Sequence, residues 1–451
     1  MGLKIYSTLT RRKQVFKPRK NRRVNLFVCG PTVYDFMHIG HAKTYIQFDV
    51  ITKYLRFSGY NVFYLQNITD LDDKIITRAK EKNTTTLKLA RKFEKYYHED
   101  EKKLGISSVN KYARATDYIK EIIKQIKVLI KKEYAYKTSD GYYYNIKKFK
   151  DYGKLSKRTV LGAESAVSRI DQSIKKKNKG DFCLWKFSKV NEPSWDTKLG
   201  KGRPGWHIED TAITESHFGP QYDVHGGARD LIFPHHEAEI AQIEAASNKK
   251  PMVKYWMHTG FLTVKGKKMG KSLNNFTTVR DALKKYNPKT LRFFYLTSHY
   301  RNPIDFSENS LEKAKNSLER LNNFAQMIKK GEKDNDKLIN STREKFKKAM
   351  DNDFDTVKAL AVIFDFIKKT NKKKLAGPKT YKLLREIDEI FGILNFKKEK
   401  IPKKVLVLIK QREEARKQKN FKQADIIRKK IEKMGYQIKD TASGSIISTL
   451  Y

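Results

Sequence analysis

Near its start, the chain changes between two hydrophobic patterns. Residues 25–30 (NLFVCG) form a short apolar run closed by a Gly-Pro pair, which is typical of a buried strand that ends in a turn. From residue 38 to about residue 57 apolar side chains recur every four positions, which predicts a helix. Residues 59–70 (GYNVFYLQNITD) predict a turn and a second strand. Strand, helix and strand in this order indicate a βαβ unit, and therefore a parallel sheet covered by helices.

The middle of the chain interrupts this alternation. We expect a helix over about residues 118–132, because isoleucine and leucine side chains fall on one of its faces. Aromatic runs (DGYYYNI, DFCLWKF) and basic loops follow to about residue 201, and then strand and helix patterns alternate again. We interpret this section as a domain inserted into the sheet domain.

From about residue 307 onward the pattern becomes helical. Residues that advance by three and four mark one amphipathic helix: Leu311, Ala314, Leu318, Leu321, Ala325 and Ile328. Further helices are expected near residues 356–369 and 381–394. A lysine-rich linker with Pro402 then leads to a small terminal module, in which Phe421, Ile427 and Ile431 mark one helix face.

These patterns predict an α/β chain whose doubly wound parallel sheet is split by an insertion and followed by a helical bundle and a small C-terminal module. A length of 451 residues is about three times that of a typical domain, which agrees with several domains. The expected boundaries are 1–116 and 202–264 for the two halves of the sheet domain, 117–201 for the insertion, 265–306 for a lysine-rich loop region, 307–396 for the bundle and 397–451 for the terminal module.

The composition restricts the environment and the partners. The 96 Lys and Arg residues against 50 Asp and Glu give a formal net charge of +46, which favours a nucleic-acid partner, although a lysine-rich composition on solvated faces is the alternative. No apolar segment is long enough to span a membrane, and the first residues lack a secretory signal. With two cysteines a disulfide framework is not expected, so a reducing cytoplasm is the simplest location.

The run CGPTVYDFMHIGHAK places His38 and His41 on either side of Gly40, where the first strand's turn enters the helix. A helix N-terminus offers unpaired N–H groups and the positive end of the helix dipole, and imidazoles add donors, so this pattern suits a polyphosphate. Gly40 leaves room for a nucleotide base to approach the backbone. Two histidines that only cap a helix are the alternative interpretation.

A second run, VKGKKMGKSLNNFTTV, surrounds Gly270 with Lys267, Lys268 and Lys271. Mobile lysines beside a glycine can close over phosphates and stabilise the charge that develops on a pyrophosphate leaving group. An ordinary basic loop is the alternative.

A third run, DLIFPHHEAEIAQIE, allows metal binding, acid–base chemistry or a plain charged helix. His235 and Glu239 are four residues apart, so on a helix they share a face and can hold one ion. His236 points about 100° away from His235 on such a helix, so we expect it to support the site and not to bind the ion.

In combination, H-I-G-H near the start and K-M-G-K-S after the split sheet resemble the class I aminoacyl-tRNA synthetases. The finer resemblance is to the cysteinyl-tRNA synthetase family. Five runs of this chain resemble blocks of that family and occur in the same order: FVCGPTVYDFMHIGHA, YLQNITDLDDKII, GRPGWHIED, DVHGGARDLIFPHHEAEIAQ and KMGKSLNNFTTVRD. This resemblance extends from residue 2 to about residue 440. It implies a nucleotide-binding sheet domain that activates L-cysteine with ATP and Mg²⁺ and transfers it to the terminal adenosine of tRNA(Cys).

The resemblance also implies roles for individual residues. His38 and His41, with Thr32 and Gly40, would bind ATP, and Lys268 and Lys271 would stabilise the transition state of adenylate formation and the departing pyrophosphate. Gly270 stands where the family loop often has serine, which adds backbone freedom and changes how the loop closes. The residues that would bind cysteine are Gly30, Thr69, Trp206 and His225.

The resemblance further implies one Zn²⁺ per chain, held by Cys29, Asp210, His235 and Glu239, that binds the thiolate of the substrate. Zinc prefers this soft ligand to the hydroxyl of serine. Bacterial relatives have a second cysteine where this chain has Asp210, but a carboxylate is an acceptable zinc ligand at about 2.0–2.2 Å. In the alternative, Asp210 caps a helix or pairs with a lysine, and zinc has three protein ligands or is absent.

By the same resemblance, the bundle and the terminal module would lie on the anticodon side of a monomer. The chain ends in GSIISTLY, without the tryptophan that the family module often has there. Two alternatives stay open: a ligase that joins activated cysteine to a small amine, whose relatives lack the terminal module, and a catalytically inactive RNA-binding relative.

Overall fold

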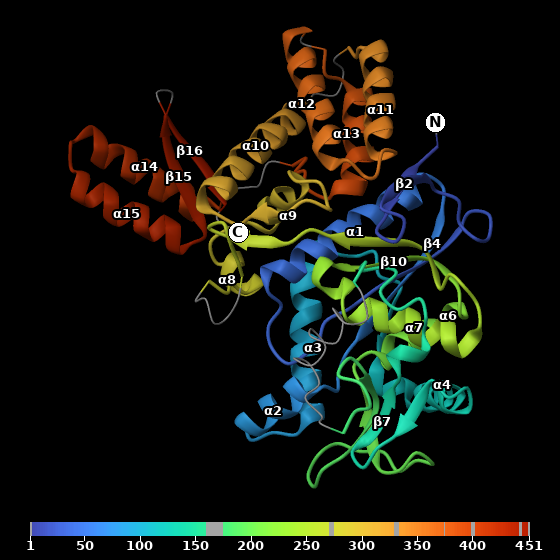
Figure 1. Ribbon diagram of the computed structural model, residues 1–451. Helices are drawn as coiled ribbons and strands as arrows, with labels where there is room; N and C mark the ends of the chain where they lie inside the picture. Colours follow the sequence, from blue (N-terminus) through green and yellow to red (C-terminus); the bar gives the residue numbers. More distant parts are fainter. Residues whose placement is uncertain are drawn as a thin grey trace.

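The computed structural model describes residues 2–158, 175–269, 275–328, 333–373, 375–397, 402–441 and 444–449. At its centre lies a five-stranded sheet in the order β11-β10-β3-β4-β5 (Figure 1). The strands are β3 (Arg23–Val28), β4 (Asn61–Ile68), β5 (Lys111–Arg114), β10 (Tyr222–Ala228) and β11 (Val253–Thr259). All neighbouring strands run parallel, so the predicted doubly wound parallel sheet is confirmed.

Both faces of the sheet are buried, because side chains alternate along each strand. Leu26 and Val224 pack with α1 (Ile39–Phe57) and α3 (Thr86–Lys103) on one face. Phe27 packs on the other face, which is covered by α4 (Ile119–Lys131), α6 (Ile208–Phe218) and α7 (His235–Ser247) (Figure 1). The sequence predicted a strand, a helix and a strand between residues 25 and 70. The structure confirms this prediction with β3, α1 and β4.

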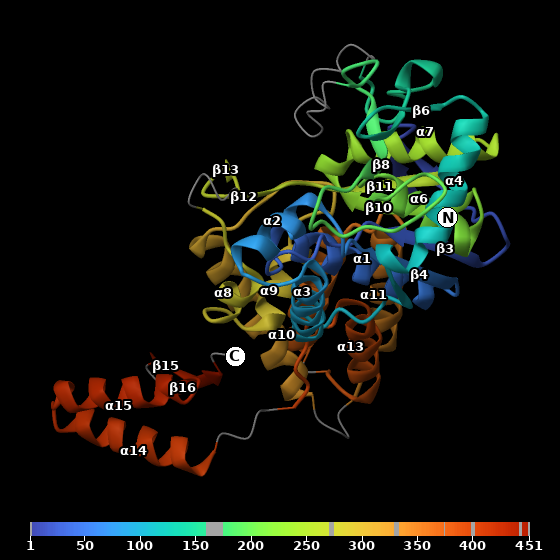
Figure 2. The ribbon, with the colours of Figure 1, turned by 90° about the horizontal axis from the view of Figure 1, so that it is seen from below.

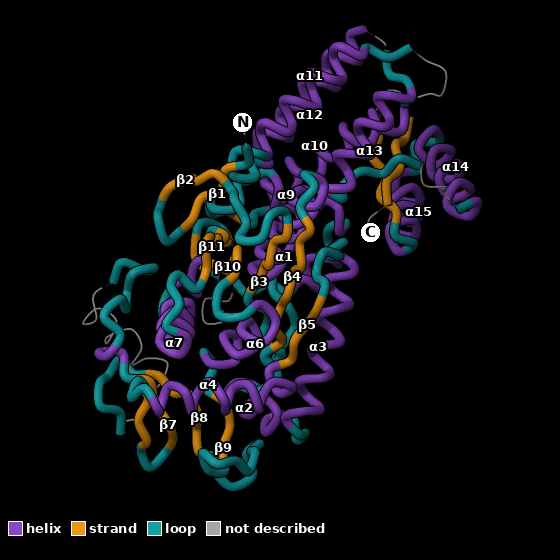
Figure 3. The backbone as a smooth tube through the Cα atoms, turned by 90° about the vertical axis from the view of Figure 1, so that its right-hand side faces the viewer, coloured by secondary structure: helices purple, strands orange, loops and turns teal. Residues whose placement is uncertain are grey.

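The insertion carries a four-stranded antiparallel sheet in the order β6-β7-β8-β9. Its strands are β6 (Ala135–Lys137), β7 (Gly141–Tyr144), β8 (Phe182–Phe187) and β9 (Gly202–Pro204), so the sheet continues just beyond the expected boundary at residue 201. Tyr144 and Trp185 share one hydrophobic cluster with Phe27 of β3, so the insertion packs onto the central domain. Figure 3 shows β7 to β9 at one end of the molecule and the bundle helices at the other.

The second half of the chain is helical. It contains α8 (Val279–Leu283), α9 (Pro288–Leu296), α10 (Glu308–Met327), α11 (Asp336–Met350), α12 (Thr356–Lys373) and α13 (Pro378–Phe391). The terminal module consists of α14 (Lys403–Lys417), α15 (Phe421–Lys433), β15 (Tyr436–Thr441) and β16 (Gly444–Thr449), and it projects away from the central sheet (Figure 2). The hydrophobic pattern had not indicated α11.

The remaining elements connect these layers. They are the hairpin strands β1 (Lys4–Ser7) and β2 (Arg12–Val15), helix α2 (Asp73–Glu81), strands β12 (Leu262–Val264), β13 (Lys267–Lys268) and β14 (Ile304–Asp305), and the 3₁₀ turns η1 (Ala115–Tyr118), η2 (Ile146–Lys148) and η3 (Arg229–Ile232). Among the described residues, every helix is too short or too polar to cross a membrane.

A buried ion pair between Asp49 of α1 and Arg292 of α9 joins the sheet domain to the bundle. Asp49 also accepts hydrogen bonds from the backbone N–H groups of Ser107 and Ser108, both at 3.0 Å. Arg292 donates to the carbonyl oxygen of Phe391 at 2.5 Å, at the end of α13. Burial alone would raise the pKa of Asp49, but the charges of Arg292 and Lys53 outweigh it and lower this pKa from 3.8 to about 2.

We expect Arg292→Met to lower the free energy of unfolding by about 3–5 kcal/mol, because it leaves the Asp49 carboxylate buried without its charged partner. The matched control is Lys53→Met, which removes the second cation of Asp49 from a side chain that is 20% exposed and should cost less than about 1 kcal/mol. Urea unfolding at pH 7 measures both changes, and equal losses would contradict the assigned role of Arg292.

The same ion pair predicts a dependence on pH. The pKa of Asp49 is lower in the folded chain than in the unfolded chain, so its stabilisation is present above pH 3.8 and is lost as the pH falls towards about 2. Urea unfolding of Asp49→Asn should therefore show less loss of stability over this pH range than the wild type.

Candidate active site and metal centre

The site lies where the strand order of the sheet reverses. From β3 the chain continues to β4 on one side, whereas β10 continues through α7 to β11 on the other side. Open parallel sheets bind ligands in the crevice at the carboxyl ends of the two strands that flank such a point. Cys29 follows β3 directly, and its backbone N–H donates to the carbonyl oxygen of Gly226 in β10 at 3.0 Å.

The histidines of the H-I-G-H run lie at the N-terminus of α1. His38 is the N-cap residue, and its Nδ1 accepts from the backbone N–H groups of Gly40 at 3.1 Å and His41 at 3.2 Å. The rings of His38 and His41 stack with centroids 3.6 Å apart. His38 therefore caps α1 through Nδ1, which leaves Nε2 as the N–H donor of that ring.

Three of the residues expected to bind ATP line one small cavity of about 20 Å³: Thr32, His38 and His41. Burial, followed by the nearby charges of His38 and Lys74, lowers the pKa of His41, so its imidazole is neutral. A Cβ atom at Gly40 would lie 2.9 Å from Nδ1 of His38. Glycine is thus required here for the close approach of the His38 ring.

Gly270 and Lys271 lie outside the described residues, as does the side chain of Lys268. The segments on both sides of this gap contact the H-I-G-H turn. The methyl group of Met269 lies 3.5 Å from the position that a Cβ of Gly40 would take, and the backbone N–H of Ile39 donates to the carbonyl oxygen of Thr277 at 3.2 Å. The lysine loop therefore begins and ends beside the histidines of α1.

The four expected metal ligands form one buried cluster. Cys29 comes from the end of β3, Asp210 from the first turn of α6, and His235 and Glu239 from the first turns of α7; one donor atom of each lies within 4.8 Å of the others. Nε2 of His235 is 3.0 Å from Asp210 Oδ2 and 3.1 Å from Glu239 Oε1. Sγ of Cys29 is 3.4 Å from Asp210 Oδ2. Asp210 thus lies within the cluster, and no described lysine lies within ion-pair distance of it.

The charges of this cluster fit a divalent cation. Burial, and then the nearby carboxylates, raises the pKa values of Cys29 and Glu239 well above their usual range. Asp210 Oδ1 and Glu239 Oε2 are buried without a hydrogen-bond partner among the described residues. Three buried acidic groups become good ligands when a cation such as Zn²⁺ lies between them.

A second donor set shares Cys29 and Glu239 and adds His225 and His236. Nε2 of His236 is 3.1 Å from Sγ of Cys29, and its Nδ1 is 2.8 Å from Nε2 of His258. Sequence reasoning gave His236 a supporting role, and the structure shows that it reaches the cysteine directly. The first set fits a cation better, because it contains both unpartnered carboxylate oxygens and three acidic donors instead of two.

The residues expected to bind cysteine surround the same cluster. The Trp206 ring stacks on His235 at 4.3 Å, and Nε2 of His225 is 3.4 Å from Sγ of Cys29. Thr69 donates a hydrogen bond to the buried carboxylate of Glu209. The backbone N–H of Gly30 donates to Asn67 Oδ1 at 2.5 Å.

Sequence reasoning missed four buried neighbours of this site: His207, Glu209, Asn67 and His258. His207 and Glu209 flank Ile208 in the GRPGWHIED block, so their position in that block was the available signal. Burial, and then the charge of Arg229, lowers the pKa of His258 to about 3, so its imidazole is neutral. Its place beside His236 follows only from the tertiary fold.

Comparison with known proteins finds relatives that match the chain over nearly its full length. A model of the class I (C) tRNA synthetase catalytic domain matches residues 15–316, and a DALR domain model matches residues 345–395. A cysteine–tRNA ligase of Thermococcus kodakarensis is 45% identical over 474 aligned residues, which cover 99% of each chain. One of Thermoplasma volcanium is 47% identical over 448 aligned residues, which cover 97% of each chain.

Solved structures agree on the fold. Mycobacterium tuberculosis methionyl-tRNA synthetase in complex with methionyl-adenylate superimposes with a TM-score of 0.61 at 17% identity, covering 78% of this chain and 83% of that one. The high identity to curated relatives over nearly the full length, together with the catalytic-domain match, shows that the chain belongs to the cysteine–tRNA ligase family of class I tRNA synthetases.

Proposed function

We propose that the chain joins L-cysteine to tRNA(Cys) in two steps at the crevice between β3 and β10. The cysteine carboxylate attacks the α-phosphate of ATP, with Mg²⁺ assisting, which gives cysteinyl-adenylate and pyrophosphate. The 2′-hydroxyl of the terminal adenosine of the tRNA then takes the acyl group. The observation that carries this proposal is that one short segment bears both Cys29 of the metal cluster and the histidines at the N-terminus of α1.

For the first step, the N-terminus of α1 provides backbone N–H groups and the positive end of a helix dipole for the phosphates. Thr32 would line the approach beside His38 and His41, Gly40 would leave room for the nucleotide, and the two imidazoles would donate hydrogen bonds. Lys268 and Lys271 would stabilise the charge that grows on the leaving pyrophosphate. The contacts of Met269 and Thr277 with the α1 turn support this role, because they keep the loop beside these histidines.

For amino-acid selection, Cys29, Asp210, His235 and Glu239 would hold one Zn²⁺. When bound, zinc supplies a soft Lewis acid that favours the thiolate of cysteine over the hydroxyl of serine. Trp206 and His225 would close the sides of this pocket, and Gly30 and Thr69 would contact the backbone groups of the amino acid. Burial of all four residues supports the assignment, because it excludes water from the metal site that would bind the sulfur of the substrate.

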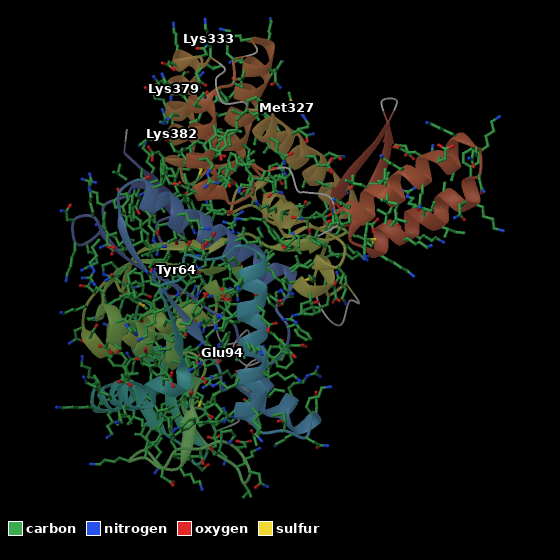
Figure 4. The ribbon with its side chains drawn as sticks, turned by 180° about the vertical axis from the view of Figure 1, so that it is seen from behind. Tyr64, Glu94, Met327, Lys333, Lys379 and Lys382 are labelled. Atoms are coloured by element: carbon green, nitrogen blue, oxygen red, sulfur yellow. The ribbon has the colours of Figure 1, made fainter. Side chains whose placement is uncertain are left out.

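The anticodon side of the tRNA would contact the helical bundle and the terminal module, and the insertion and the 265–306 region would hold the acceptor arm. Exposed lysines of the bundle, such as Lys333, Lys379 and Lys382, support this assignment (Figure 4). The relatives that match 99% of the chain, terminal module included, favour a tRNA ligase over a small-amine ligase or an inactive relative. We expect a cytoplasmic monomer.

The two donor sets predict different metal-binding variants. We expect one Zn²⁺ per chain in the wild type, and Asp210→Ala should weaken zinc binding by about 100-fold or more, because it removes a direct ligand. His236→Ala is the matched control and should change the affinity by less than about 10-fold, since it removes an imidazole beside Cys29 but not a ligand. Metal content and competition with a chelator measure both. Strong zinc binding by Asp210→Ala together with weak zinc binding by His236→Ala would indicate that the second donor set holds the metal.

Cysteine-dependent exchange of pyrophosphate into ATP should occur without tRNA. We expect serine to support exchange on the order of 10⁴-fold less well, and a chelator to remove the preference. Lys271→Ala should lower exchange by about 10²–10³-fold, because it removes charge stabilisation from the transition state. Absence of exchange in the wild type would favour the inactive RNA-binding relative. Exchange without charging of tRNA would favour the small-amine ligase.

The net charge of +46 predicts that affinity for tRNA falls steeply with salt. Lysines and arginines that neutralise phosphates release bound counterions, so the logarithm of the binding constant should fall linearly with the logarithm of the salt concentration. Filter binding between 50 and 200 mM salt, about the range in which such losses are large, measures the slope. Binding that does not change with salt would contradict an electrostatic role for the lysine-rich surface.

A further inference from the structure

Lys43 is a buried cation of α1, two residues beyond the H-I-G-H run, and it is only 1% exposed. Its Nζ donates to three backbone carbonyl oxygens, those of Gly260 at 2.6 Å, Asn302 at 2.7 Å and Phe261 at 3.3 Å. Burial lowers the pKa of Lys43 to about 7. The three acceptors favour the protonated amine, because that form has three N–H donors. A buried polar group with all its partners in place fixes the backbone that it contacts.

The three carbonyl groups lie where two strands of a small sheet begin. Gly260 and Phe261 precede β12, and Asn302 precedes β14. These two strands pair in parallel, and β13 pairs with the other side of β12, which gives the order β13-β12-β14. In Figure 2, β12 and β13 lie at the edge of the molecule, apart from β10 and β11 of the central sheet. Lys43 therefore attaches the base of this small sheet to α1.

The small sheet carries the start of the lysine loop. Lys268 of β13 pairs with Thr263 of β12, which lies two residues beyond the last of the three carbonyl groups. Asp305 of β14 ties the three strands together, because its Oδ1 accepts from the hydroxyl of Thr263 at 2.8 Å and from the backbone N–H of Gly266 at 2.7 Å. The sheet is thus one unit, and a shift at its base would also move the backbone of Lys268.

The two ends of the lysine loop are attached to α1 in different ways. After the loop, the backbone N–H of Ile39 donates to the carbonyl oxygen of Thr277 at 3.2 Å, and the backbone N–H of Val279 donates to that of Met37 at 2.8 Å. A substitution of a side chain leaves such backbone hydrogen bonds in place. Before the loop, the attachment includes the side chain of Lys43. A single substitution can therefore change where the loop begins relative to α1.

We propose that Lys43 is a positioning residue of the adenylation step. It holds the sheet at the base of the lysine loop against the helix whose N-terminus would bind the phosphates of ATP. The inference rests on the proposed function, which assigns the loop lysines to the departing pyrophosphate. A cation stabilises a transition state only where the charge develops, and a displacement of about 1 Å can lower a rate by about 100-fold.

The test is cysteine-dependent pyrophosphate exchange by full-length Lys43→Met, which keeps an unbranched side chain but removes the amine. We expect kcat to fall by about 100-fold, because the loop lysines lose their placement. The KM values for cysteine and ATP should stay within about three-fold, because the lost interaction acts in the transition state. Lys43→Gln keeps a shorter side chain with two N–H donors, so its kcat should fall by about ten-fold. It replaces Lys43→Met if that variant does not fold.

Gln47→Met is the matched control. Gln47 lies one turn further along α1, is also 1% exposed, and its side chain donates to the carbonyl oxygen of Tyr295 at 2.7 Å. Tyr295 lies in the last turn of α9, so this variant weakens the contact of α1 with α9 and leaves the small sheet attached. Thermal unfolding should show a loss of stability, because a buried carbonyl loses its donor. The kcat of exchange should stay within about two-fold of the wild type.

A double-mutant cycle with Lys271→Ala tests whether Lys43 acts through the lysine loop. If it does, Lys43→Met should lower kcat by about ten-fold or less in the Lys271→Ala background, because a cation that Lys43 positions is already absent. Residues that act independently would instead give losses that multiply. A role in packing alone would not produce this coupling.

Four results would overturn the inference. Unchanged kcat in Lys43→Met would show that the rate does not depend on this attachment. Equal losses of kcat in Lys43→Met and Gln47→Met would assign the effect to the packing of α1. A raised KM for ATP with unchanged kcat would assign Lys43 to nucleotide binding. The full loss in the Lys271→Ala background would show that Lys43 acts independently of the loop. Absence of exchange in the wild type is a distinct result, which refutes the proposed function and the inference with it.

Discussion

The parallel pairing of β3 with β10 is the constraint on which the rest of the site depends. It sets Val28 beside Gly226, and the next residue, Cys29, continues the ladder through its N–H group. A side chain at Gly226 would collide with Phe48 of α1, so the close contact between this helix and the strand requires glycine. Because the chain continues from β3 into α1 and from β10 into α7, one pairing brings the N-termini of both helices to the same crevice.

Burial gives this crevice its chemistry. Cys29, Asp210 and Glu239 lie together with histidines around them, and no described lysine or arginine forms an ion pair with them. Such a cluster is costly unless a cation lies within it, so a bound metal and a stable fold depend on each other. Aspartate in place of a second cysteine keeps the anionic charge of the donor set and makes it harder, which would leave a bound metal more electrophilic towards a thiolate.

Local sequence was sufficient for features that depend on neighbouring residues. The apolar spacing predicted β3, α1 and β4, and the four-residue spacing of His235 and Glu239 predicted their shared face on α7. The grouping of Cys29 with Asp210 came only from the family resemblance, because hydrogen-bond distances between such distant residues depend on the tertiary fold. The contact between His236 and His258 also depends on the tertiary fold, so no local pattern indicated it.

The helical bundle also positions two distant segments, the β1–β2 hairpin and the segment before β14. Asp353, in the turn between α11 and α12, is fully buried and accepts from the backbone N–H of Tyr6, the hydroxyl of Tyr300 and the guanidinium of Arg301, each at 2.8 Å. One carboxylate therefore fixes both the hairpin and the segment before β14 to the bundle. Since packed elements move as units and not by continuous deformation, the positions of these two segments follow the packing of the bundle against the sheet domain. The turn between α11 and α12 thereby helps to position a hairpin that lies against the central sheet, where the backbone N–H of Thr8 donates to the carbonyl oxygen of Trp256 at 2.8 Å.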